Sequence, residues 1–219
     1  MASSGTSTRT RNPRGEGARL REEIVEAASD LLEQSGSESA ITLRAVARGV
    51  GISAPSIYPH FADREEILNA VLARAFEALV ARMRVAVERE EDPVARLRAA
   101  AYAYVAFAAE QPHRYRVLFE PHRPLGTAPI KKPQTVESMV GADPFAVLLD
   151  AVRDCIDAGA SKAPSPLAAA IELWVALHGY VTLRASTPEF PWPDTDEVLE
   201  TLIVRLAWIK RRHRGTKGP

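Results

Sequence analysis

The side chains best suited to chemistry in this sequence are short hydrogen-bond donors between residues 39 and 62. These 24 residues contain two arginines and no acidic residue, although residues 1–62 together carry seven basic and seven acidic side chains. Hydroxyl, phenol and imidazole donors contact phosphates without adding a large net charge, and backbone N–H groups at a helix start add further donors. The stretch contains Thr42, Ser53, Ser56, Tyr58 and His60. We therefore predict contacts with a nucleic acid backbone.

Two short helices joined by a tight turn are needed to position these donors. The first begins after Thr42 and closes at Gly51, which supplies the positive φ that the turn needs. The second begins at Ser53 and runs to about Pro59. This is helix-turn-helix geometry, in which the second helix enters the major groove of DNA. A buried helical hairpin with a solvated polar face fits the same spacing, so the spacing alone leaves both interpretations open.

Residues 56–68 read SIYPHFADREEIL. This run closely resembles the signature of the TetR (tetracycline-repressor-like) family of bacterial transcription factors. In that signature Tyr-x-His-Phe ends the recognition helix, and a basic residue and an acidic, apolar helix start follow. Val46-Ala47 and Gly51-Ile52-Ser53 match as well, so the resemblance covers about residues 20–70. It implies a DNA-binding transcription factor.

The resemblance also implies separate roles for residues that hold phosphates and residues that read bases. The expected phosphate contacts are Thr42, Tyr58, His60 and Arg64, with Ser53 at the start of the recognition helix. The candidates for base edges are Arg44, Ala54, Pro55 and Ser56. Pro59 stands where the family often has arginine, so a phosphate-binding charge is missing and the recognition helix is expected to be short. Base reading therefore relies on Arg44, Ser56 and apolar contact with thymine methyl groups.

The rest of the chain predicts one helix after another. Three starts pair a capping residue with proline at the first helical position, namely Asp92-Pro93, Asp143-Pro144 and Ser165-Pro166. The expected helices lie at about 18–34, 42–51, 53–59, 63–90, 93–110, 112–120, 143–159, 165–186 and 194–212. We expect an all-α fold of about nine helices, in which a three-helix DNA-binding domain precedes a larger helical ligand-binding and dimerisation domain. The expected divisions are a disordered basic arm (1–17), the helix-turn-helix domain (18–62), the helical domain (63–213, with a loop at 121–142) and a tail (214–219).

Composition excludes several other classes of protein. The 28 basic and 28 acidic residues balance, which argues against indiscriminate polyanion binding. The single cysteine, Cys155, allows no intramolecular disulfide and no multi-cysteine zinc site. The longest run free of Asp, Glu, Lys and Arg is 49–62, and the apolar runs free of charge are 99–109 and 173–183. All three are well short of the roughly 20 residues of a membrane span. The polar start, residues 1–23, has no secretory signal pattern. We expect a cytoplasmic protein with no cofactor and no contact with a membrane.

One motif in the second half, Trp174-Val175-Ala176-Leu177-His178-Gly179, resembles the Trp-x-x-x-His-Gly C-terminal domain of a subset of the TetR family. Trp174 and His178 share one helix face, and Gly179 lets another helix approach. His178 is either a ligand or metal contact or a hydrogen-bonded structural residue, and we favour the structural role. The five histidines show no paired metal-ligand spacing, and Cys155 has no nearby histidine. We therefore expect no metal site, no catalytic residue and a buried structural thiol.

An effector pocket is expected around the alanine-rich stretch 99–109, which is apolar on all sides. Such a helix is buried on several sides, and alanines beside aromatic residues leave space for a small molecule. Plain core packing fits the pattern equally well, but the family resemblance favours a pocket against the long helix that begins at Asp63. The expected lining is Phe76, Met83, Tyr102, Tyr104, Phe107, Trp174 and His178.

The last two long helices, 165–186 and 194–212, carry apolar stripes that either close the monomer core or form a four-helix interface between two copies. The resemblance favours a homodimer, which reads two half-sites. We predict a ligand-responsive repressor released from a palindromic operator by an unidentified small molecule. The alternatives are an activator, an effector-independent or architectural DNA binder, and an enzyme using His178, Tyr104 or Glu172, for which no nucleophile–base pair is evident.

Overall fold

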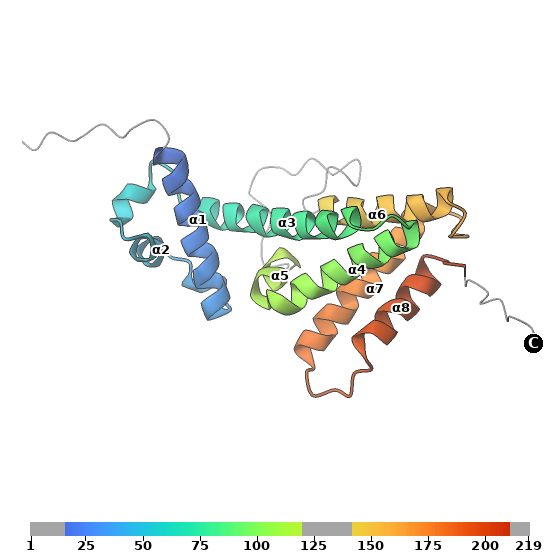
Figure 1. Cartoon of the computed structure of the whole chain (residues 1–219). Helices are drawn as coiled ribbons and strands as arrows, with labels where there is room; N and C mark the ends of the chain where they lie inside the picture. Colours follow the sequence, from blue (N-terminus) through green and yellow to red (C-terminus); the bar gives the residue numbers. More distant parts are fainter. Residues whose placement is uncertain (1–15, 120–141, 211–219) are drawn as a thin grey trace, which may run out of the picture. The chain divides into compact units, whose positions relative to one another are not determined.

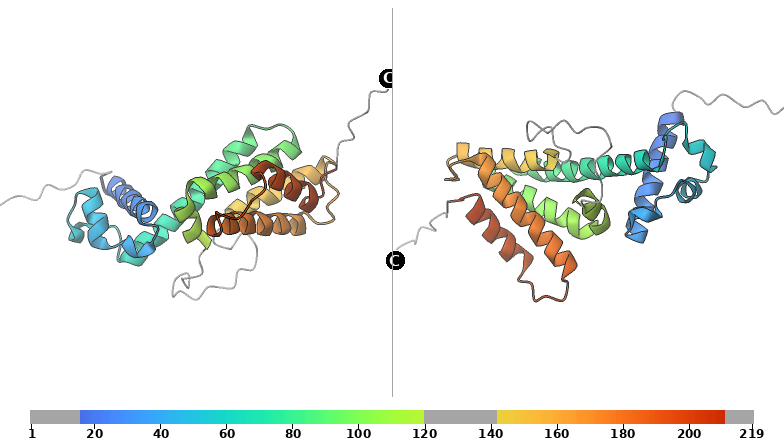
Figure 2. Two further views of the ribbon diagram at one scale, coloured as in Figure 1. Left: turned by 90° about the horizontal axis from the view of Figure 1, so that it is seen from below. Right: turned by 180° about the vertical axis from the view of Figure 1, so that it is seen from behind.

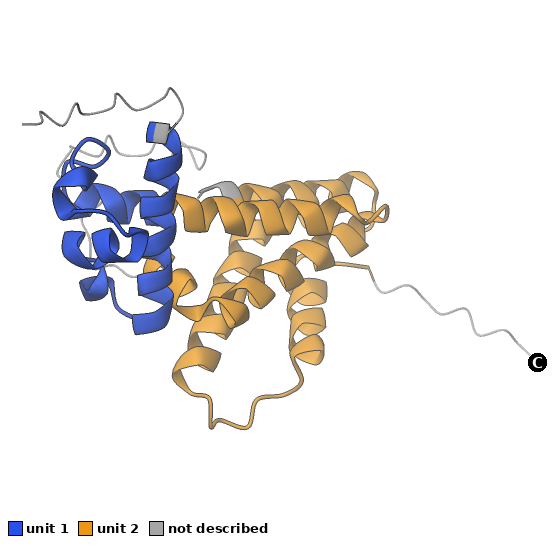
Figure 3. Cartoon of the chain, turned by 60° about the vertical axis from the view of Figure 1, so that its left-hand side comes forward, with its two compact units in different colours: residues 1–71 blue, residues 72–219 orange. Residues whose placement is uncertain are grey.

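The computed structural model describes residues 16–119 and 142–210, which form two compact helical units (Figures 1 and 3). The first unit covers residues 1–71 and the second covers residues 72–219. The described residues contain eight α-helices, two short 3₁₀-helices and one isolated β-bridge, but no β-strand. This confirms the all-α expectation. The expected arm up to residue 15, the loop at 121–141 and the tail from residue 214 lie outside the described residues.

The first unit packs short elements against a long first helix. It contains α1 (Glu16–Ser35), η1 (Glu38–Ala40), α2 (Leu43–Val50), η2 (Ala54–Ile57) and the start of α3 (Arg64–Glu88). Its buried apolar residues include Ile24, Ala28, Leu32, Val46, Ala47 and Ile57. Helices α1 and α2 approach closely at Gly49. A Cβ added at this position would lie only 3.3 Å from the Cβ of Ala27. Gly51 follows α2 with a φ of 76°, as the predicted turn requires.

The expected recognition helix at 53–59 differs from the prediction. It is the 3₁₀-helix η2, Ala54–Ile57, followed by a turn in which the His60 N–H donates to the Ile57 carbonyl at 2.8 Å. Pro59 has no N–H group, so it cannot donate the bond back to Pro55 that would continue an α-helix. Ser53 makes no side-chain cap, and its hydroxyl instead bonds that of Ser56 at 2.7 Å. The described residues therefore hold eight α-helices where about nine were expected.

Helix α3 begins at Arg64, one residue after the expected start at Asp63. The Asp63 carboxylate accepts from the Glu66 N–H at 2.8 Å, and the Glu66 carboxylate accepts from the Ala62 N–H at 2.7 Å. These two bonds form a reciprocal cap at the start of the helix. The helix starts in the first unit and continues without interruption into the second.

The second unit is built around α4. Its remaining elements are α4 (Pro93–Glu110), α5 (Pro112–Phe119), α6 (Ala142–Asp157), α7 (Pro166–Ser186) and α8 (Thr195–Leu206). Asp92 and Ser165 cap α4 and α7 through their side chains, each followed by a proline, as predicted. Helix α4 packs against α5, α6, α7 and α8, as expected for a helix that is apolar on all sides. Helices α7 and α8 lie side by side and run in opposite directions (Figures 1 and 2).

Helix α8 ends six residues earlier than the expected residue 212. Trp208 has a φ of 52°, which an α-helix does not allow. The chain then pairs with the α6–α7 connection, where the Lys162 N–H donates to the Trp208 carbonyl at 3.0 Å and the Lys210 N–H donates to Ala160 at 2.9 Å. The Ser161 hydroxyl donates to the Ala207 carbonyl at 2.7 Å. These contacts join segments about 45 residues apart, so local sequence patterns did not reveal them.

Among the described helices, α7 alone is long and apolar enough to cross a membrane by length and composition. This is weak evidence, because a core helix has the same composition. Leu173, Leu177 and Tyr180 bury one face of α7 within the second unit. We therefore attribute the apolar character of α7 to contacts with protein.

Ser161→Ala tests the anchor of the chain after α8. The buried hydroxyl of Ser161 donates to the Ala207 carbonyl and accepts from the Ala163 N–H at 3.0 Å. Because both backbone groups would lose their partner, we expect the free energy of unfolding to fall by about 1–3 kcal/mol. Thermal denaturation followed by circular dichroism measures this, at about 2–4 °C per kcal/mol. Ser186→Ala, which removes an exposed hydroxyl, is the control, and an equal change in both variants would contradict the anchor.

Candidate functional site

The predicted DNA-contacting residues of the first unit remain accessible to solvent. Tyr58 is 59% exposed, although the neighbouring Ile57 is completely buried and anchors η2 in the core. Thr42 caps α2 by accepting from the Ala45 N–H at 3.1 Å, which leaves its O–H free to donate. The other candidates are exposed (Arg44, Ser53, Pro55) or half-buried (Ala54, Ser56, His60, Arg64). The structure therefore presents α2 and η2 as an accessible donor surface.

Arg64 is held by the protein itself. Its Nε donates to the Ile41 carbonyl at 2.6 Å, and its terminal nitrogens donate to the Glu38 carbonyl and to Glu65 at 3.0 Å. Three of the five N–H donors of this side chain are thus engaged. Arg64 fixes the segment immediately before α2, a role that sequence reasoning did not identify. Its phosphate contact stays a prediction.

Arg64→Lys separates these two roles. Lysine keeps the positive charge but lacks the planar fork that bonds two carbonyls at once. We expect a loss of about 1–3 kcal/mol in the free energy of unfolding of the first unit, measured by chemical denaturation. Arg48→Lys, at an exposed position of α2, is the control. If Arg64→Lys leaves stability unchanged, the structural role is wrong.

In the second unit, three polar side chains form a hydrogen-bonded chain within the core. The Tyr115 hydroxyl lies 2.7 Å from the Tyr104 hydroxyl and 2.7 Å from Nδ1 of His178. Burial raises the pKa of Tyr104 to about 12, against the opposing effects of hydrogen bonds with Tyr115 and Trp174. Burial also raises the pKa of Tyr115 and lowers that of His178. The three side chains are therefore uncharged at neutral pH.

Aromatic rings surround this chain. The ring of Phe119 has its centroid 4.7 Å from that of His178, 6.2 Å from that of Phe76 and 6.5 Å from that of Trp174. It also lies 4.9 Å from the ring of Tyr115. Four predicted pocket residues, Phe76, Tyr104, Trp174 and His178, thus meet around two residues of α5. Tyr115 and Phe119 were not among the predicted residues, although their spacing of four places both on one helix face.

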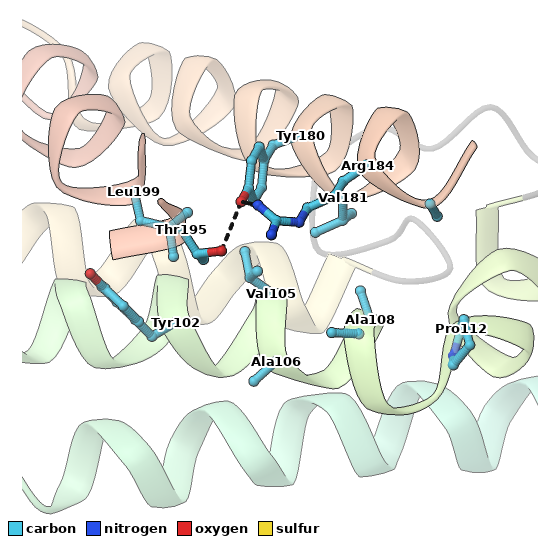
Figure 4. Close-up of a pocket in the computed structure, with 12 residues that line it drawn as sticks. Tyr102, Val105, Ala106, Ala108, Pro112, Tyr180, Val181, Arg184, Thr195 and Leu199 are labelled. Carbon is cyan, nitrogen blue, oxygen red and sulfur yellow. Dashed lines mark hydrogen bonds between the residues drawn. The ribbon is translucent and has the colours of Figure 1, made fainter. Parts of the chain in front are cut away.

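The other predicted pocket residues lie elsewhere. Met83 and Phe107 are almost completely buried in the hydrophobic core. Tyr102 faces away from Tyr104 on α4 and lines a separate cavity of about 500 Å³ beside α7 and α8 (Figure 4). The structure therefore divides the predicted set between an aromatic cluster, the core and this cavity.

Cys155 is completely buried, and its Sγ–H donates to the Pro93 carbonyl at 3.2 Å. Burial, together with nearby Asp92 and Asp154, raises the pKa of the thiol to about 12. This environment is that of a structural thiol, because a reactive cysteine needs a lowered pKa. The described residues hold no group of three His, Cys, Asp or Glu side chains that could bind a metal ion.

A helix-turn-helix unit followed by a helical body defines a class of DNA-binding regulators, and comparison with known proteins identifies the family. Residues 24–71 match the family model "Bacterial regulatory proteins, tetR family", and residues 97–206 match "Tetracyclin repressor-like, C-terminal domain". The chain belongs to the TetR family. The Trp-x-x-x-His-Gly subset stays a prediction.

Individual relatives agree with this assignment. An uncharacterized HTH-type transcriptional regulator of Mycobacterium tuberculosis is 32% identical over 90% of this chain and 85% of its own length. A protein of unknown function from a Rhodococcus species has a similar structure, with a TM-score of 0.71, 27% identity and coverage of 86% of this chain and 94% of that one. The TetR family regulator PfmR of Thermus thermophilus shares the fold, with a TM-score of 0.56, 20% identity and coverage of 86% and 99%. The protein is a DNA-binding transcriptional regulator, not an enzyme, and regulators of this family bind operator DNA as dimers.

The lowered pKa of His178 predicts a pH dependence. In the unfolded chain His178 has its ordinary pKa near 6.5, so as the pH falls it binds a proton before His178 of the folded protein does. The free energy of unfolding therefore decreases as the pH falls below about 6.5. We expect His178→Asn, which keeps an acceptor but does not titrate, to flatten the change in Tm between about pH 7.5 and pH 5.5. His113→Asn is the matched control, and an identical effect of both substitutions would refute the assignment to His178.

Proposed function

We propose that this protein is a homodimeric repressor in the bacterial cytoplasm, released from a near-palindromic operator by a small molecule. The observation that carries the proposal is an exposed apolar face on α7. Leu167, Ile171 and Val175 recur at intervals of four residues and are 41%, 42% and 62% exposed. Eight residues further along the helix, Leu183 is 55% exposed. Contiguous apolar surface of this kind marks an interface with another protein.

Gly179 lies on this face, between Val175 and Leu183, and supports a close helix crossing. A Cβ added at this position would meet nothing within 4 Å in the described part of the chain. Glycine inside a helix costs about 1 kcal/mol relative to alanine, and no neighbour within the described residues accounts for it. A helix of a second copy that crosses α7 here does account for it. The sequence predicted only that another helix approaches at Gly179, and we propose that this helix belongs to the second copy.

Helix α8 extends the proposed interface. Val198, Leu202 and Leu206 are half-buried against the core and leave part of their apolar surface exposed. Two copies of α7 and α8 would form a four-helix contact. Because α8 ends at Leu206, the second half of the interface spans 195–206 and not the expected 194–212.

The dimer sets how the protein reads DNA. Two recognition segments about 34–36 Å apart would reach successive major grooves on one side of the duplex. Thr42, Ser53, Tyr58 and His60 would hold phosphates, with Arg64 adding its remaining donors. Arg44, Ala54, Pro55 and Ser56 would face the base edges.

A bound effector would act through α3. The Arg82 side chain on α3 forms a two-pronged ion pair with Glu110 at the end of α4, at 2.5 and 2.7 Å. Movement of α4 would therefore move α3, which continues into the DNA-binding unit. A preference of about 1–3 kcal/mol for the non-binding state weakens DNA binding about 5–150-fold.

Gly179→Leu tests the interface directly. Leucine removes a helix-destabilising glycine and meets open space within the described chain, so we expect the isolated chain to be at least as stable as the parent. It would block the close crossing, so we expect monomers by light scattering and operator affinity at least tenfold weaker.

Val175→Glu should have the same effect, because it buries a charge in an apolar interface. The matched control is Ala78→Glu, at an exposed position of α3 outside the proposed interface. If both Gly179→Leu and Val175→Glu remain dimeric, the proposed interface is wrong.

The division between phosphate contacts and base reading predicts distinct binding defects. Tyr58→Phe and His60→Ala should weaken binding to all sequences, whereas Arg44→Ala and Ser56→Ala should relax sequence preference. For Tyr58→Phe the salt dependence should not change, because the lost phenol carries no charge. Fluorescence anisotropy with DNA from upstream of the gene and with scrambled DNA measures both effects.

Gln34→Ala, at an exposed position of α1, is the control for these variants. Equal losses on both DNAs for all four substitutions would overturn the division of roles.

A further inference from the structure

The cavity between α4, α7 and α8 has the size and lining of a small-molecule site. Its volume of about 500 Å³ falls within the range of ligand pockets, about 300–1,000 Å³. Small and apolar side chains form most of its wall, among them Val105 and Ala109 of α4, Val181 of α7 and Leu199 of α8. The hollow exists because α4 offers alanines where larger residues would fill the space (Figure 4).

One cation borders this apolar wall. Arg184 of α7 donates to the Tyr180 hydroxyl at 2.5 Å, and its guanidinium lies 5.7 Å from the centre of the Tyr180 ring. Within residues 16–119 and 142–210 it forms no ion pair with a carboxylate. By contrast, Arg82 and Arg98 of the same unit pair with Glu110 and Glu200. Arg184 thus has donors left over at the cavity.

The cavity's other polar groups hold Arg184 in place. The Tyr180 hydroxyl, which accepts from Arg184, donates to Thr195 Oγ1 at 3.1 Å (Figure 4). The Thr195 hydroxyl then has its own proton to donate. The cavity therefore combines an apolar wall with a cation and a hydroxyl donor, and none of the residues that line it carries a negative charge. This combination suits an anion attached to an apolar body.

We propose that the cavity binds an organic carboxylate with an apolar body. The carboxylate pairs with the Arg184 guanidinium and accepts from Thr195, and the apolar body lies against Val105, Ala109 and Leu199. The planar guanidinium matches a carboxylate through two parallel hydrogen bonds. Burial of the apolar body supplies the rest of the affinity.

We infer that this carboxylate is the effector, and this inference rests on the proposed function as a ligand-released repressor. The ligand would lie between α4 and the α7–α8 pair, which also forms the proposed dimer interface. Glu110, the anchor of α4 to α3, directly follows Ala109 in the cavity wall. A bound molecule therefore touches both elements through which DNA binding would change.

Calorimetric titration of the purified full chain with octanoate tests the site without DNA. Octanamide, which has the same shape without the charge, is the matched ligand. We expect octanoate to bind at least tenfold more tightly than octanamide, and Arg184→Gln to weaken octanoate by at least tenfold. Ala109→Phe, at an exposed position that lines the cavity, should abolish binding of both ligands. Arg205→Gln removes a cation of α8 outside this cavity and should change nothing.

Equal binding of octanoate and octanamide, an unaltered affinity of Arg184→Gln, or no octanoate binding at about 10 mM overturns the proposed site. Anisotropy of the DNA complex then tests its regulatory role. Octanoate that binds at Arg184 without releasing DNA upholds the site and refutes its role as the effector site. Absence of sequence-specific DNA binding without octanoate refutes the proposed function and leaves the carboxylate site standing.

Discussion

Two tyrosine hydroxyls and one imidazole share an apolar core in the second unit, and each must find a hydrogen-bond partner there. A buried polar group left without one costs about 1–3 kcal/mol. Tyr104, Tyr115 and His178 meet this requirement by bonding to one another, with both distances at 2.7 Å. Because they come from α4, α5 and α7, rotation of any one of these helices would leave a polar atom unpaired. The chain of bonds therefore fixes the rotation of α7 about its axis.

This rotation explains why one apolar face of α7 is buried and the other is exposed. With His178 directed at Tyr115, the buried face carries Leu173 and Leu177. Ile171 and Val175 lie nearly opposite on the helix, because positions two apart differ by about 200°, and they are exposed. No change in the rotation could bury both faces within one chain, so the second face must remain in water or meet another protein. The apolar composition that allows α7 to resemble a membrane span follows from this double requirement.

Sequence patterns predicted the starts of α4 and α7 well, whereas α6 begins at Ala142, one residue before the expected cap Asp143. The Asp92-Pro93 and Ser165-Pro166 starts lie where expected, because capping depends on neighbours within three residues. The two failures have identifiable causes. The 3₁₀ form of η2 follows from Pro59, which shortens the recognition helix as expected and also prevents the α-helical hydrogen bond to Pro55. The early end of α8 depends on pairing with the distant Ser161, which periodicity does not report. The pocket prediction grouped Tyr102 with Tyr104, although residues two apart on a helix point about 200° apart.

Two arginines on α3 each fix a contact within one of the two units. Arg82 forms an ion pair with Glu110 at the end of α4, and Arg64 donates a hydrogen bond to the Ile41 carbonyl just before α2. A half-exposed ion pair such as Arg82–Glu110 adds little stability. Its two parallel hydrogen bonds do fix the direction of the contact. The ion pair therefore serves mainly to position α4 against α3. Both arginines belong to one uninterrupted helix of 25 residues. Helix α3 therefore carries one positional contact in each unit, and the proposed effector response rests on this feature.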